Sequence, residues 1–93
     1  LMAVGDIVNG IAASGVVLTF QPAASVSVTI TTAFCDNAWV SMTDGTTIAN
    51  CYHGSHSTGG NGLGMNEKFM ITNSIYLHID SGNQKHFTGI QIA

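Results

Sequence analysis

Residues 24–31, within the predicted strand 24–32, alternate strictly between apolar and small polar side chains. Val26, Val28 and Ile30 take every second position, and serine or threonine occupies the positions between them. A period of two places one set on each face of an extended chain, which predicts a half-buried antiparallel strand. Helix-favouring residues are scarce beyond the first dozen positions, and 11 of the 93 residues are glycine. We therefore expect an all-β fold.

Other segments follow the same pattern. We predict further strands at 15–21, 38–43, 46–51, 68–72, 75–80 and 85–92. The predicted turns are Gln21-Pro22-Ala23, a type I′ hairpin at Asp44-Gly45, Asn73-Ser74, and a hairpin loop at 81–84 that would pair the last two strands. Residues 1–14 suit an arm or edge strand, and residues 53–64, with five glycines, suit a long loop. Seven or eight short strands in one domain, residues 1–93, predict a small antiparallel β-sandwich or a jelly-roll-like barrel.

Charge is unusually sparse in this chain. Seven side chains carry a formal charge, which is 8% of the residues, where an ordinary soluble domain has about 25%. Two basic residues cannot follow a phosphate backbone or attach to an anionic membrane, so nucleic-acid and polybasic membrane binding are not expected. A hydrophobic fraction of 45% exceeds what so small a core can hold. We expect much of the surface to contact neighbouring subunits.

No targeting or membrane-spanning segment is expected. The apolar stretch from residue 7 to residue 20 is short, and glycine and polar residues interrupt it. Met2 followed by Ala3 is typical of a translation start. These features predict a chain that is complete and has no signal peptide.

The cysteines and two of the histidines offer a metal-binding hypothesis. Cys51, His53 and His56 are closely spaced, and Cys35 could supply a fourth tetrahedral zinc ligand. The spacing fits no standard paired-ligand motif, so two buried or half-buried cysteines and two solvated loop histidines are the alternative. A Cys35–Cys51 disulfide would close a loop of about 15 residues. Without a secretion signal, reduced thiols are favoured, and no cofactor is expected.

Catalytic signatures are weak, and we expect no enzymatic activity. No nucleophile lies on a strand-to-helix turn, and no glycine-rich phosphate loop opens a helix. If the terminal hairpin forms, His78 and His86 lie on adjacent strands and share a polar outer face with Tyr76 and Asp80. That face, together with Trp39 if it is exposed, could contact a partner or a sugar, or could be an ordinary solvated face.

The order of these segments resembles that of small β-sheet virion proteins of tailed bacteriophages. The segments that carry the resemblance are the start MAVGDIVNGIAASG, the strand SVSVTITT and the ending ITNSIYLHIDSGNQKHFTGIQI. The family comprises capsid decoration (cement) proteins and compact head domains of phage fibres. The resemblance implies a β-sandwich or jelly-roll-like fold, homotrimers at capsid three-fold positions or fibre tips, and no enzymatic activity. It assigns a role to no individual residue.

The sequence thus predicts a non-enzymatic virion structural protein. We expect a capsid decoration protein that forms a homotrimer, contacts the major capsid protein or another virion protein, and is assembled in the host cytoplasm. The alternative is a receptor- or glycan-binding head domain of a phage fibre. The predicted partner-contact residues are Trp39, Tyr76, His78 and His86; the glycan site of the alternative would be formed by Tyr76, His78, Asp80 and His86, or by Trp39 if it is exposed.

Overall fold

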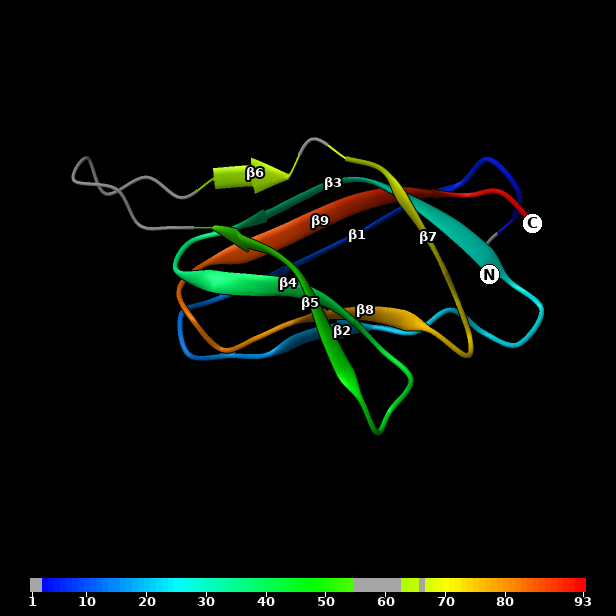
Figure 1. The fold of residues 1–93 in the computed structure, drawn as a ribbon. Coiled ribbons are helices and arrows are strands. Elements are labelled where there is room, and N and C mark those ends of the chain that lie inside the picture. Colours follow the sequence, from blue (N-terminus) through cyan, green and yellow to red (C-terminus); the bar gives the residue numbers. More distant parts are fainter. Residues whose placement is uncertain (1–2, 55–62, 66) are drawn as a thin grey trace.

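A computed structural model describes residues 3–54, 63–65 and 67–93. These residues form nine strands in two antiparallel sheets that pack as two layers (Figure 1). The all-β sandwich prediction is confirmed. Eight strands correspond to predicted segments, and the ninth is a short addition. In the described part of the chain, no helix could span a membrane.

Sheet A is built around a long central strand. Its order is β1 (Ile7–Ala12), β9 (Lys85–Gln91) and β3 (Ser27–Cys35). Two short strands, β6 (Leu63–Met65) and β7 (Phe69–Thr72), both pair with the remaining side of β3. The predicted N-terminal arm or edge strand is therefore an edge strand, β1.

Sheet B holds the other four strands. Its order is β2 (Leu18–Phe20), β8 (Tyr76–Ile79), β4 (Ala38–Thr43) and β5 (Ile48–Gly54). Strands β4 and β5 form the predicted hairpin. Among the described residues, β2 and β5 are the edge strands of sheet B.

The core lies between the two sheets. Strand β3 contributes Val28 and Ile30, β8 contributes Leu77 and Ile79, and β9 contributes Phe87. The four aliphatic residues have no exposed surface. Burying each such side chain stabilises the fold by about 1.5–3 kcal/mol.

A bulge changes which residues of β3 face the core. The pairing of β3 with β9 shifts between Ile30 and Thr32. Val28 and Ile30 are buried before the shift, and Ala33 and Cys35 are buried after it. An extra residue in one strand reverses the face to which its later side chains point. Strand β3 ends at Cys35, three residues beyond the predicted end at Thr32. The prediction stopped there because the bulge interrupts the alternation in the sequence.

The β4–β5 turn is longer than predicted. Thr43 pairs with Ile48, so the loop contains the four residues 44–47. A type I′ turn needs a positive φ at both central residues, but in this loop only Gly45 has one, at 96°. The Asp44 carboxylate instead accepts hydrogen bonds from the backbone N–H groups of Thr46 and Thr47, at 2.9 and 2.7 Å. The prediction of a type I′ turn is wrong.

The predicted terminal hairpin does not form. Strand β8 pairs with β2 and β4 in sheet B, whereas β9 pairs with β1 and β3 in sheet A. The loop at 81–84 crosses from one layer to the other. This crossing lets Leu77 on β8 and Phe87 on β9 enter the same core from opposite sides.

The predicted loop at 53–64 is partly strand. His53 and Gly54 belong to β5, and Leu63 and Gly64 belong to β6. Residues 55–62, including His56, lie outside the described residues.

Candidate functional site

Three of the four predicted contact residues share the outer face of sheet B. Trp39 on β4 is 38% exposed, whereas its neighbours Ala38 and Val40 are buried in the core. Tyr76 and His78 on β8 are half-buried and alternate with buried Leu77 and Ile79. The alternation that places the apolar residues inside thus places these side chains outside.

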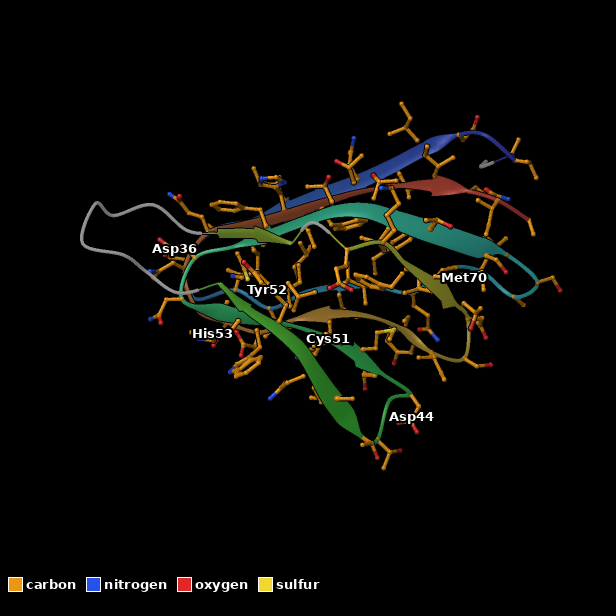
Figure 2. The ribbon with its side chains drawn as sticks, turned by 45° about the horizontal axis from the view of Figure 1, so that its top comes forward. Asp36, Asp44, Cys51, Tyr52, His53 and Met70 are labelled. Atoms are coloured by element: carbon orange, nitrogen blue, oxygen red, sulfur yellow. The ribbon has the colours of Figure 1, made fainter. Side chains whose placement is uncertain are left out.

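Trp39 is held in a small cluster of polar and aromatic groups. Its ring meets the His53 ring edge to face, with centroids 4.9 Å apart and planes at 60°. The Trp39 backbone N–H donates to the Asp80 carboxylate at 3.1 Å, and the Asp80 N–H donates to the Trp39 carbonyl at 3.2 Å. His53 lies on β5 (Figure 2). The sequence did not indicate this pairing of Trp39 with His53, because it depends on the strand register.

The middle of the same face is also polar. The Ser41 hydroxyl donates to the Asn50 side-chain oxygen at 2.8 Å, and Ser41 lies opposite His78 in the β4–β8 ladder. Aromatic surface beside hydrogen-bonding groups is a chemistry that can bind a polar ligand such as a sugar.

His86 lies on the opposite side of the molecule. It is exposed on β9 in sheet A, where its ring stacks on that of Phe34, with centroids 5.0 Å apart and planes 9° apart. The prediction that His78 and His86 lie on adjacent strands is therefore wrong. It failed because the two strands belong to different sheets.

The outer face of sheet A exposes large apolar side chains and no charged one. Lys85 is the one charged residue in β1, β3, β7 and β9, and it is buried. The large apolar side chains exposed on these strands are Ile7 at 68%, Ile11 at 82%, Met70 at 55% and Ile90 at 39%. Threonines, Asn9 and His86 fill the positions between them. The register aligns Ile7 with Ile90, and β3 links that row to Met70 on β7 (Figure 2).

One end of this face is hollowed. A depression of about 780 Å³ is lined by Ile11, Ala13, Phe34, Lys85 and His86, among others. The Lys85 ammonium does not point freely into it, because it donates to the carbonyl oxygens of Val16 and Ala13. Burial lowers the pKa of this ammonium below its ordinary value, and Asp80 partly opposes that shift. Apolar contact is thus the main chemistry that the depression offers.

The cysteines do not form a shared site. Cys35 is buried in the core, and its thiol donates to the Ala38 carbonyl at 3.2 Å. Burial raises the pKa of this thiol. Cys51 lies on β5 (Figure 2) and is exposed, so the expectation that both cysteines are buried or half-buried is wrong for Cys51. Both cysteines are free. His53, the third described zinc candidate, lies beside Trp39. Among the described residues, no three His, Cys, Asp or Glu side chains gather as a metal site would require.

Comparisons of the chain with protein-family models, with curated proteins and with solved structures give no match. The two outer faces of the sandwich are therefore the features of this chain that bear on its function.

Proposed function

We propose that this protein is a non-enzymatic structural component of a virion, which attaches to a larger protein assembly through the outer face of sheet A. The observation that carries the proposal is that this face exposes four large apolar side chains and no charged one. Exposed apolar patches of this kind are typical of interaction surfaces.

The two faces differ in a way that suits a surface attachment. Removing apolar area from water contributes about 25 cal/mol per Å² before the costs of association are subtracted. The sheet A face supplies such area without requiring a buried charge. The sheet B face also exposes Trp39 and Ile48, but its His78, Asn50 and Asp80 side chains supply hydrogen-bonding groups that are better suited to remain in water. A protein built this way would cover a partner with one side and present the other to solvent.

The resemblance to phage virion proteins supports a more specific form of the proposal. In that form the protein decorates and stabilises a phage head and binds the major capsid protein; the three-fold homotrimer is what the resemblance alone implies for its oligomeric state. It would be found in the virion after assembly in the host cytoplasm. Neither the low charge nor the apolar face identifies the partner; the partner comes from the resemblance alone.

Purified virions of the genome that encodes the chain provide the test. We expect mass spectrometry to find the protein in the particles, and Met70→Asp to reduce its incorporation at least about tenfold by placing a charge in the interface. Ile48→Asp is the matched control, because Ile48 is 53% exposed, close to the 55% of Met70, but lies on β5 in sheet B. Absence of the protein from the particles, or equal incorporation of Met70→Asp and wild type, would overturn the proposal.

A glycan-binding fibre head is the second candidate function. The cluster of Trp39, His53 and Asp80 favours it, since an exposed indole offers a stacking surface beside a carboxylate. A glycan array distinguishes the two functions. Specific binding that is lost in Trp39→Ala and Tyr76→Ala, but kept in Ile75→Ala, would support the fibre head. No binding to any glycan would count against it.

A further inference from the structure

Strand β1 is an open edge of sheet A. Among the described residues it pairs only with β9, and all six of its residues follow a continuous register. The strand contains no charged residue and no proline, the devices that commonly protect an edge from pairing with another chain. Strand β1 therefore lacks the side chains that would hinder its pairing with a strand of another chain.

The other edges are less suited to pairing. Strand β5 has a register shift opposite Val40 and Ser41, and such bulges twist an edge away from a new partner. Strands β2 and β6 contain three residues each, and β7 contains four. In the described part of the chain, β1 is therefore the longest edge without an interruption.

The backbone groups that β1 presents can be identified. The Gln91 N–H donates to the Asp6 carbonyl at 3.0 Å, so Asp6 directs its carbonyl toward β9. Antiparallel strands alternate the side to which successive residues direct their N–H and C=O groups. Val8, like Asp6, therefore directs its backbone groups toward β9. Among the described residues, the N–H and C=O groups of Ile7, Asn9 and Ile11 have no partner strand.

We propose that a second copy of this chain pairs with β1 in antiparallel fashion, about a two-fold axis that passes through Asn9. In this arrangement Asn9 lies opposite the partner's Asn9, and Ile7 lies opposite the partner's Ile11. All free groups of β1 find a partner, which gives about six backbone hydrogen bonds. The exposed isoleucines of the two copies then extend one apolar outer face across both molecules.

This register is selected by the side chains. A shift of one residue would place core-facing residues opposite outward-facing ones. A shift of two residues would place an isoleucine opposite Asn9. The Asn9-centred register pairs isoleucine with isoleucine and sets Asp6 opposite the partner's Ala12, so it brings no like charges together.

Self-association through β1 is independent of the attachment of Met70 to a virion. It also differs from the three-fold homotrimer that the resemblance implies, because an antiparallel pair of identical strands closes with two copies. The oligomeric state therefore tests the inference directly.

Disulfide crosslinking tests the register. In a Cys51→Ser background, Asn9→Cys should form a crosslinked dimer under mild oxidation, because opposite Cα atoms in a hydrogen-bonded pair are about 5.5 Å apart, a distance that a disulfide spans. Ile7→Cys and Ile11→Cys should crosslink poorly alone but well when mixed. Equal crosslinking of all three single variants, or none for Asn9→Cys, would overturn the proposal.

Proline substitution tests the hydrogen bonding. Asn9→Pro removes an N–H that points to solvent in the monomer, so the fold should survive while the dimer dissociation constant rises at least about tenfold. Gly10→Pro removes an N–H that faces β9 and should unfold the edge. Sedimentation of wild type as a trimer or a monomer, or unchanged dimerisation of Asn9→Pro, would overturn the inference. If Asn9→Pro is still incorporated into virions, the proposed function stands whatever the result for the dimer.

Discussion

The Lys85 ammonium donates a 2.6 Å hydrogen bond to the carbonyl oxygen of Val16. A second bond, to Ala13 at 3.3 Å, holds the same connection between β1 and β2. Lys85 is 1% exposed, so one of the two basic residues of the chain lies inside it. Its ammonium therefore hydrogen-bonds the start of β9 to residues 13–17, the segment that connects β1 in sheet A with β2 in sheet B.

Replacing Lys85 should destabilise the protein to a degree that depends on the new side chain. We expect Lys85→Ala to reduce the free energy of unfolding by about 2–4 kcal/mol, because it leaves a cavity and two carbonyl oxygens without this donor. Lys85→Met keeps most of the packing and should cost about 1 kcal/mol. Urea unfolding of both variants provides the measurement. Equal stability of Lys85→Ala and wild type would contradict a stabilising role for the hydrogen bonds from Lys85 to Val16 and Ala13.

Lys85 should also make the stability depend on pH. Burial lowers its pKa below the ordinary 10.5. Just below pH 10.5 the unfolded chain therefore binds a proton here that the folded chain does not, and the free energy of unfolding rises with pH across this window. The stability that neutral Lys85 contributes is present above pH 10.5 and is lost as the pH falls through the pKa of Lys85 in the folded protein. The stability difference between wild type and Lys85→Met should increase as the pH rises toward 10.5; a flat difference would contradict the lowered pKa.

The sequence was sufficient to predict most strands but not their distribution between sheets. Alternation in residues 24–32 and 75–80 reports which side chains face a core, and Val28 and Leu77 are buried as predicted. A period of two carries no information on which sheet a strand joins. The 81–84 loop therefore looked like a hairpin although it crosses between layers. The bulge between Ile30 and Thr32 in β3 broke the alternation on which the prediction of that strand depended.

For the candidate site, too, the sequence predicted which side chains face outward but not which strands lie next to one another. Trp39, Tyr76 and His78 could be placed on an outer face from alternation alone, and the structure brings them to one face. His86 was misplaced with the hairpin. The contact between Trp39 and His53 depends on the β4–β5 register, which a segment without alternation after Cys51 did not reveal. The apolar face of sheet A likewise required the order of β1, β9, β3 and β7.

Asp44 should stabilise the β4–β5 turn. Its carboxylate accepts two backbone hydrogen bonds, and those from Thr47 and Thr46 lower its pKa below the ordinary 3.8. The stability that this carboxylate contributes is present above pH 3.8 and is lost as the pH falls through the folded value. Asp44→Ala should therefore lower the melting temperature at pH 7 and remove part of the acid sensitivity. Asp44→Asn, which keeps an acceptor oxygen, is the control. An Asp44→Ala protein that melts like wild type at pH 7 would contradict this role.

The two cysteines should differ sharply in reactivity. Cys35 is buried and its pKa is raised by that burial, so little reactive thiolate forms near neutral pH. Cys51 is exposed. A thiol reagent at pH 8 should modify one thiol per folded chain and a second only after denaturation. In Cys51→Ser the folded protein should react slowly, and in Cys35→Ala it should react as fast as wild type. Rapid labelling of Cys35 in folded Cys51→Ser would contradict its burial.

Gly82 should be far less tolerant of a side chain than Gly15. A Cβ at Gly82 would overlap the backbone carbonyl of Asn37 and approach the Ala38 Cβ to 2.7 Å. Because a backbone carbonyl cannot rotate away as a side chain can, Gly82→Ala should reduce the free energy of unfolding by about 3 kcal/mol. Gly15 has a φ of +82° and no atom within 4 Å of a Cβ, so Gly15→Ala should cost only about 1 kcal/mol of backbone strain. Chemical denaturation of the two variants compares these costs. Similar stabilities of the two variants would contradict this prediction, because they would mean that loop 81–84 can shift away from Asn37 and Ala38 to make room for a Cβ.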